Sequence, residues 1–265
     1  MIDVANISGG RSSMYMGLYL YYAGFKGIYC FQNTGMETPE TVEFLRKAPF
    51  PLVVLQYKDT KPFFTVETLD TMARKGEPFK QLTRKRSRVP NALERFCTGE
   101  MKVLTLRRYI RSLGEKKWKS YLGIRADEPD RVVKIKRTYQ KNNGKTVQNT
   151  PVFPLVSKGI TSTAIGEFWR KIDWDIDLPL LPNGKTVMGN CVGCFHKSEA
   201  ELALTLKRYP DLYAIMESIE KEIGGTFRNG YSMEEFRKQV DDNPHFDFDF
   251  ENEVYCTSEN GSCGD

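Results

Sequence analysis

The sequence predicts an α/β protein with a doubly wound parallel sheet, followed by a mostly helical, cysteine-bearing C-terminal extension. Short apolar runs alternate with segments of helical length over the first 157 residues, and this alternation is typical of a parallel sheet covered on both faces. Strand signals become scarce after residue 157, which predicts the helical extension. We therefore expect an α/β domain at residues 1–157 and the extension at residues 158–265.

The strands and helices are expected in strict order along the chain. In the first region, strands are predicted at residues 2–7, 27–32, 52–56 and 118–123. Helices are predicted at residues 13–22, 39–47, 65–74 and 99–113. Residues 80–88 are strongly basic and are expected to form a loop. Beyond residue 157, helices are expected at residues 163–172, 199–208 and 211–223.

Composition excludes several classes of protein. With 40% hydrophobic and 28% charged residues among 265, the chain is not disordered. No apolar stretch approaches the roughly 18 residues of a membrane helix, and no signal peptide is visible, so we expect a cytoplasmic protein. Six cysteines in such a protein argue against a disulfide framework and favour metal or redox use. The net charge of +5 permits an anionic ligand.

A serine- and glycine-rich turn follows the first predicted strand and precedes the first helix. Its glycines allow the backbone to approach a ligand closely, and the helix start offers free amide groups and a positive dipole end. These features predict a phosphate or sulfate site, and a plain tight turn with helix caps is the alternative. The site residues would be Ser8, Gly9, Gly10, Arg11, Ser12 and Ser13.

Two further segments follow predicted strands and should face the same crevice. Asn33, Thr34 and Gly35 come directly after the second strand. Arg125 and Arg131 flank the loop after the strand at residues 118–123 and are candidates for binding anionic groups of a ligand. A structural ion pair with a neighbouring acidic side chain is the alternative for both arginines.

Cysteines in three regions could share one metal site. Cys191 and Cys194 form a C-x-x-C turn, Cys97 precedes a predicted helix, and Cys256 and Cys263 lie near the end of the chain. The spacing suits thiolate ligands of an iron–sulfur cluster or of zinc, and inert thiols are the alternative. The remaining cysteine, Cys30, lies within an apolar run and is expected to be a small core residue.

In ordered motifs, residues 1–157 resemble the phosphoadenosine phosphosulfate reductase family of the adenine-nucleotide α-hydrolase (PP-loop) superfamily. The resemblance rests on Ser-Gly-Gly-x-x-Ser at residues 8–13, Asn-Thr-Gly…Pro-Glu-Thr at 33–41, Cys-Thr…Lys at 97–102 and Gly-Ile-Arg…Glu…Arg at 123–131. The C-terminal part is similar to a phage-associated subgroup through Phe-Trp at 168–169, Asp-x-x-Leu-Pro and Gly-Asn-Cys-x-x-Cys-Phe at 189–195. The sequence departs from the family at Ser12, where ATP-cleaving members carry aspartate, and lacks the Glu-Cys-Gly-Leu-His segment.

The resemblance implies an adenine nucleotide, either a sulfonucleotide or ATP with Mg²⁺, bound at the PP-loop. It also implies a 4Fe–4S cluster on Cys97, Cys191, Cys194 and one tail cysteine, with Cys263 preferred over Cys256 and zinc as the alternative metal. If the chain is phage-encoded, it would act in the host cytoplasm.

Three functions remain open at this point. The first is sulfonucleotide reduction, in which Cys256 or Cys263 would be the nucleophile and a reductant protein a further partner. The second is ATP-dependent sulfur transfer to a nucleobase or small molecule, with release of AMP and pyrophosphate. The third is a non-catalytic nucleotide or nucleic-acid-binding module with structural metal. Nucleic-acid binding would use Lys80, Arg84, Lys85, Arg86 and Arg88, and it is less favoured than a solvated loop or a lid over the nucleotide.

Overall fold

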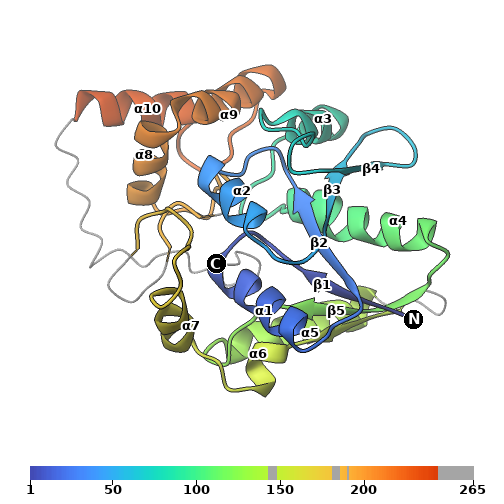
Figure 1. Ribbon diagram of the computed structural model, residues 1–265. Coiled ribbons are helices and arrows are strands. Elements are labelled where there is room, and N and C mark those ends of the chain that lie inside the picture. The colour runs from blue at the N-terminus through green and yellow to red at the C-terminus, as the bar shows by residue number, and fades with distance from the viewer. Residues whose placement is uncertain (143–147, 181–185, 190, 244–265) are drawn as a thin grey trace.

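A six-stranded, mostly parallel sheet forms the centre of the computed structural model, which describes residues 1–142, 148–180, 186–189 and 191–243 (Figure 1). The strand order is β4-β3-β2-β1-β5-β6. Only the β3–β4 pair is antiparallel among the strand pairs of the described residues. The strands are β1 (Ile2–Asn6), β2 (Ile28–Asn33), β3 (Leu52–Tyr57), β4 (Phe64–Glu67), β5 (Lys117–Leu122) and β6 (Gln148–Val152).

Helices cover both faces of the sheet and form a second layer beyond the carboxyl ends of its strands (Figure 1). The α/β region contains α1 (Arg11–Tyr22), α2 (Pro39–Arg46), α3 (Glu77–Arg86), the π-helix η1 (Thr98–Leu104), α4 (Thr105–Ser112), α5 (Pro129–Asn142) and α6 (Pro154–Ser157). The extension contains α7 (Ser162–Trp169), α8 (Glu199–Arg208), α9 (Pro210–Ile223) and α10 (Met233–Asp242). The predicted fold class is confirmed.

Three apolar clusters hold these layers together. On one face of the sheet, α1, α2 and α7 pack around Phe31, Phe44 and Trp169. On the other face, α4 packs on Cys30 and Trp118, and Cys30 is fully buried, as expected for a core residue. The third cluster joins α3, α8, α9 and α10 to residues at the ends of β2 and β3. The extension therefore packs directly against the carboxyl edge of the sheet.

Two local predictions are wrong. Residues 65–74 were expected to be helical, but Phe64–Glu67 forms strand β4 beside β3. The Thr68 hydroxyl then accepts a hydrogen bond from the Thr71 backbone at 3.2 Å, and such local bonds compete with a helix. Residues 80–88 were expected to be a loop, yet Glu77–Arg86 is helix α3. Lysine, glutamine and arginine favour helices, and Phe79 and Leu82 bury one face of this helix.

The remaining expected elements are present within a few residues of their predicted bounds, and α8 matches its prediction at both ends. Strand β6 and helices α5, α6 and α10 were not predicted. Among the described residues, no helix has both the length and the apolar character needed to cross a membrane.

Candidate functional site

The loop between β1 and α1 is closed by hydrogen bonds between its own serines. The Ser13 hydroxyl accepts from the Ser8 backbone at 3.0 Å and from the Ser8 hydroxyl at 2.9 Å, and it donates to the Gly10 carbonyl at 2.9 Å. Gly9 has a φ of +86°, and a Cβ at this position would lie 2.5 Å from the Thr41 side chain. Ser13 and Gly9 therefore set the shape of the loop, which ends at the N-terminus of a twelve-residue helix.

The Arg11 side chain makes an ion pair with the extension. Its guanidinium is 4% exposed, and Nη2 lies 3.1 Å from the carboxylate of Asp175. The sequence predicts that Arg11 contributes its positive charge to binding an anion. In the structure, Arg11 is paired with Asp175, so an internal carboxylate already balances part of this charge. This ion pair ties the first residue of α1 to the segment that follows α7.

The strand order changes side at β1: β2 pairs with one edge of β1 and β5 with the other, and all three strands are parallel. Ligands of open α/β sheets bind at such a switch point, outside the carboxyl ends of the strands. The two loops that meet here are in close contact. A Cβ on Gly123 would lie 2.7 Å from the Ser13 Cα, and Arg125 Nη1 lies 3.3 Å from the Ser12 hydroxyl. We call the space between these loops the switch-point crevice.

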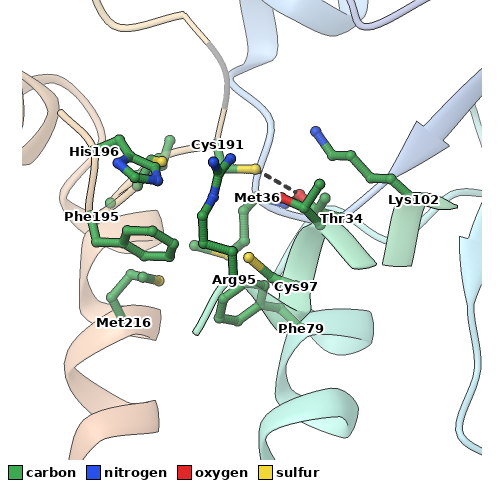
Figure 2. A pocket seen from close by; sticks show the side chains of 14 residues that line it. Thr34, Met36, Phe79, Arg95, Cys97, Lys102, Cys191, Phe195, His196 and Met216 are labelled. Carbon is green, nitrogen blue, oxygen red and sulfur yellow. Dashed lines mark hydrogen bonds between the residues drawn. The ribbon is translucent and has the colours of Figure 1, made fainter. Parts of the chain in front are cut away.

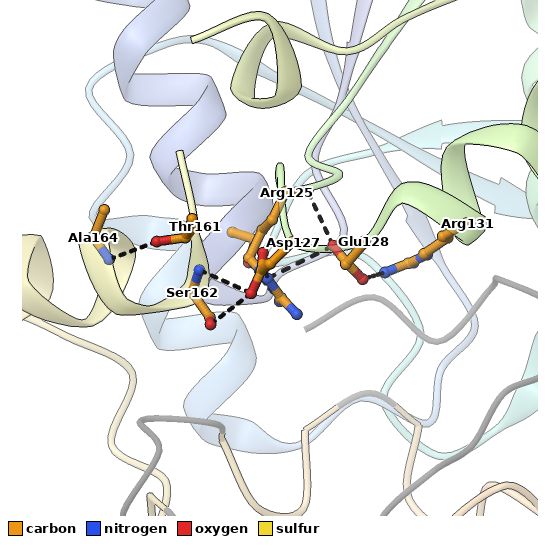
Figure 3. A network of polar contacts seen from close by, with 8 residues as sticks. Arg125, Asp127, Glu128, Arg131, Thr161, Ser162 and Ala164 are labelled. Atoms are coloured by element: carbon orange, nitrogen blue, oxygen red, sulfur yellow. Dashed lines mark hydrogen bonds and ion pairs between the residues drawn. The ribbon is translucent and has the colours of Figure 1, made fainter. Parts of the chain in front are cut away.

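Arg125 and Arg131 both take part in an acidic network beside this crevice (Figure 3). Arg125 Nε lies 3.2 Å from Asp127, and Glu128 accepts from the Arg125 backbone at 2.9 Å and from Arg131 Nη1 at 2.7 Å. Asp127 also accepts from the Ser162 hydroxyl at 2.7 Å. Burial raises the pKa of Asp127, but hydrogen bonds from Ser162 and the charge of Arg125 outweigh it and lower the pKa below its ordinary value.

These contacts are the structural ion pairs that the sequence left open as the alternative for both arginines. Arg125 also reaches Ser12 across the crevice, so its role in ligand binding stays a prediction.

The loop after β2 is organised by two side chains. The Asn33 amide donates to Gln56 at 2.8 Å and to the Ala73 carbonyl at 2.9 Å, and its oxygen accepts from the Gly35 backbone. Glu37 is 7% exposed and accepts from both the backbone and the hydroxyl of Thr34. Sequence reasoning missed Glu37, although it lies within the polar run at residues 33–41.

Three cysteines from two distant segments line one cavity of about 60 Å³ (Figure 2). Cys97 immediately precedes η1, and Cys191 and Cys194 lie in the loop before α8. That loop is joined to the end of β2 through a bond from the Val192 amide to the Met36 carbonyl at 2.7 Å. Gly193 has a φ of +68°, and a Cβ there would lie 2.7 Å from Met216, so the turn between the two cysteines requires glycine.

The environment of these thiols combines burial with positive charge. Burial raises the pKa of Cys191 to about 12, and it also raises the pKa of Cys97. The charge of Lys102, which lines the cavity, lowers both pKa values but does not offset burial. Each thiol therefore keeps its proton at neutral pH unless a bound metal replaces it. The Thr34 hydroxyl lies 3.2 Å from the Cys191 sulfur and joins the cavity to the loop after β2.

The described residues contain no group of three or more His, Cys, Asp or Glu side chains close enough to hold a single metal ion. Thiolates are ligands of both zinc and iron–sulfur clusters, and the three thiols that line this cavity belong to that donor class. Cys256 and Cys263 lie outside the described residues.

Two nitrogen-bearing side chains line the cavity beside the cysteines. Arg95 and His196 both line the cavity. Burial, together with the charges of Arg95 and Arg228, lowers the pKa of His196 to about 4, so its imidazole is neutral. His196 follows the C-x-x-C turn by two positions, but no pattern in the sequence places Arg95 beside it.

Comparisons with known proteins show one sequence relative and a weak structural likeness. No family model matches the sequence. The chain is 29% identical over 237 residues to the uncharacterized nin region protein ORF290 of Escherichia phage lambda, covering 83% of this chain and 74% of that protein. This relative is a phage protein, in line with the phage-associated subgroup in the resemblance. The specific resemblance to phosphoadenosine phosphosulfate reductases stays a prediction.

Among solved structures, the U34-tRNA thiolase NcsA from Methanococcus maripaludis, determined with its 4Fe–4S cluster, matches 84% of this chain and 73% of its own. Sequence identity is 16% and the TM-score is 0.39. A TM-score of this size does not establish a common fold.

Proposed function

We propose that the chain is an iron–sulfur enzyme of sulfur chemistry that binds an adenine nucleotide, as its resemblance to phosphoadenosine phosphosulfate reductases implies. The observation that carries the proposal is the adjacency of two sites along one edge of the sheet. The switch-point crevice lies at the ends of β1 and β5, and the cysteine cavity lies at the end of β2, which pairs with β1. Thr34 connects the cavity to that edge through its contact with Cys191.

In the crevice, the nucleotide phosphates would lie against the amide groups of the turn at residues 8–13. The dipole of α1 favours negative charge at this point. Arg125 would contact an anionic oxygen from the opposite loop, where its fork already reaches the Ser12 hydroxyl. Asn33 and Gly35 would act through the shape of their loop, because the Asn33 amide is engaged in internal hydrogen bonds.

In the cavity, Cys97, Cys191 and Cys194 would hold a 4Fe–4S cluster, with Cys263 proposed as the fourth ligand ahead of Cys256. The charge of Lys102 acts on both Cys97 and Cys191 and would stabilise their thiolate forms. A bound cluster would supply a site for sulfur or for electrons close to the nucleotide.

Two reactions fit this pair of sites. In sulfonucleotide reduction, a thiol attacks the sulfur of the bound nucleotide, the bond from that sulfur to the phosphate oxygen breaks, and the nucleotide leaves without its sulfate. Two electrons from a reductant then cleave the new sulfur–sulfur bond, which releases sulfite and restores the thiol. In sulfur transfer, ATP adenylates an oxygen atom of the acceptor and releases pyrophosphate, after which sulfur replaces the activated oxygen and AMP leaves.

The cluster is tested by purifying the protein without oxygen and measuring iron, zinc, and the visible and EPR spectra. We expect about four iron atoms per chain and no stoichiometric zinc. Cys191→Ser should lose the iron and destabilise the protein, since ligand binding is linked to folding. Cys30→Ser is the matched control and should keep the iron, because Cys30 is buried within the sheet core. Stoichiometric zinc without iron would refute the cluster.

The nucleotide is tested by calorimetric titration with three compounds, which are ATP, adenosine phosphosulfate and phosphoadenosine phosphosulfate, followed by product analysis. Sulfite indicates reduction, whereas AMP with pyrophosphate indicates transfer. Tight binding without any product, with every candidate acceptor tried, would favour a non-catalytic module. Failure of all three nucleotides to bind would overturn the assignment of the crevice.

A further inference from the structure

The positive charge of the chain is concentrated in two segments. Residues 80–111 carry ten lysines and arginines and two acidic residues, and α5 carries five cations and one acid. These two segments therefore hold a net charge of about +12 while the whole chain has +5, so the remainder is net negative. Charge asymmetry of this kind is typical of proteins that bind nucleic acid.

The two cationic segments meet at one groove. A surface groove of about 440 Å³ is lined by residues of η1 and the start of α4, including Val103, Leu104 and Arg107, and by Thr138 of α5. Lys134 and Lys141 lie four residues before and three residues after Thr138, on the same side of α5. Glu100, an acidic residue in the lining, is already bound by Arg86 and Arg108.

The groove also carries apolar surface between its cations. Phe96 lines it, and the guanidinium groups of Arg86 and Arg88 each lie 5.9 Å from the Phe96 ring centre. Val103 is 44% exposed in the same groove. Alternation of cations with an aromatic side chain is the arrangement by which proteins bind single strands, because bases stack on the ring while cations follow the phosphates.

The groove and the cysteine cavity share part of their lining. Arg95 and Thr98 line both spaces, and Cys97 lies between them in the sequence. A strand lying in the groove would therefore pass beside the cavity. A base stacked inside a duplex could not reach a recessed cavity without leaving the stack, so the geometry suits an unpaired strand.

We propose that the groove between η1, α4 and α5 binds single-stranded nucleic acid and presents one base to the cysteine cavity. This inference rests on the proposed function, for which it names the substrate class and thereby favours sulfur transfer over sulfonucleotide reduction. This surface overlaps with the one expected at residues 80–88 only at its edge, through Arg86 in the lining and Arg88 beside Phe96, while Arg84 is paired with Glu222.

The test is fluorescence anisotropy with labelled 20-nucleotide single-stranded RNA and DNA of mixed sequence, a DNA duplex, and ATP as competitor, over a range of salt concentrations. We expect one of the single strands to bind more tightly than the duplex, with affinity falling linearly on a log–log plot against salt. The double variant Arg107→Ala/Lys141→Ala should reduce that slope by about 1.4, since each lost phosphate contact on a single strand accounts for about 0.7.

The matched control is Lys47→Ala/Arg170→Ala, which removes the same charge at exposed positions outside the groove. It should leave the slope unchanged, and thermal melting verifies that both double variants are folded. Ultraviolet cross-linking adds a positional readout, because trypsin releases residues 96–102 as one peptide from the junction of groove and cavity. We expect the cross-linked base on this peptide.

Any of four results would overturn the proposal. The two double variants could show equal salt slopes, or the cross-links could fall only on other peptides. The duplex could bind more tightly than either single strand, or millimolar ATP could displace the strand completely. Repeating the strand-binding titration with Cys191→Ser distinguishes failure of the groove proposal from failure of the proposed function. Strand binding should survive loss of the cluster, whereas a protein that binds iron and ATP but no strand would refute the groove alone.

Discussion

Replacing Gly123 by alanine should disturb the switch-point crevice because two loops touch there without room for a methyl group. A Cβ on Gly123 would lie 2.7 Å from the Ser13 Cα, 3.0 Å from its nitrogen and 3.1 Å from the Ser12 carbonyl carbon. Optimal separation between carbon atoms is about 3.5–4.0 Å. All three neighbours are backbone atoms, so no side chain can rotate away to make space.

The strain must therefore move one loop against the other. Leu122, the residue before Gly123, is paired with Asn6 in the β1–β5 ladder, so the freer response is displacement of the turn at residues 8–13. Overpacking of this kind costs about 1–3 kcal/mol. Each kcal/mol shifts the melting temperature of a protein of this size by about 2–4 °C, so we expect a decrease of about 2–12 °C.

Nucleotide affinity should fall as well, since the displaced turn supplies the amide groups of the proposed phosphate site. Loss of one neutral hydrogen bond, at about 0.5–1.5 kcal/mol, corresponds to roughly 2- to 12-fold weaker binding. Thermal melting by circular dichroism and calorimetric titration with nucleotide measure the two effects on the same sample.

Gly166→Ala is the matched control, with the opposite expected sign. Gly166 lies within α7, and no neighbouring atom would come within 4 Å of its added Cβ. Alanine is favoured over glycine inside a helix by about 0.5–1 kcal/mol, so this variant should melt about 1–4 °C higher and bind nucleotide normally. A Gly123→Ala protein that melts and binds like the wild type would show that the two loops are not in contact.

Three other predictions follow from single contacts. Ser13→Ala should lower the free energy of unfolding by about 0.5–1.5 kcal/mol in urea titrations, because it removes the acceptor of the Ser8 amide and hydroxyl in the loop. An unchanged midpoint would refute this role. Arg125→Lys should weaken nucleotide binding as Arg125→Ala does, because lysine lacks the planar fork that reaches across the crevice; if both bind like wild type, Arg125 has only a structural role. Burial raises the pKa of Glu40, but hydrogen bonds from Tyr209 and Arg208 outweigh it, so its pKa is lowered from 4.5. Glu40→Gln should lower the free energy of unfolding by about 1–2 kcal/mol at neutral pH. This difference from the wild type should shrink as pH falls below 4.5, because the Glu40 carboxylate becomes protonated.

The sequence alone determined those parts of the protein whose cause is local. The apolar runs of β1, β2, β3 and β5 identify a buried parallel sheet, because such strands are covered on both faces. The start of α8 is likewise readable from Ser198 and Glu201, which form a capping box in the structure. The turn at residues 8–13 could also be placed from local signals, because its glycines separate an apolar run from a segment of helical length.

Only the tertiary structure decided the features that depend on partners distant in sequence. The preference of residues 65–74 for a helix was overridden by pairing with β3, and α3 is a helix whose apolar side is buried against the extension. The spacing of Cys97 from Cys191 contains no information on their distance in space. They line one cavity because the bond from Val192 to Met36 holds the C-x-x-C turn beside the end of β2. Contacts of this kind form when the whole chain packs, so local preference cannot encode them.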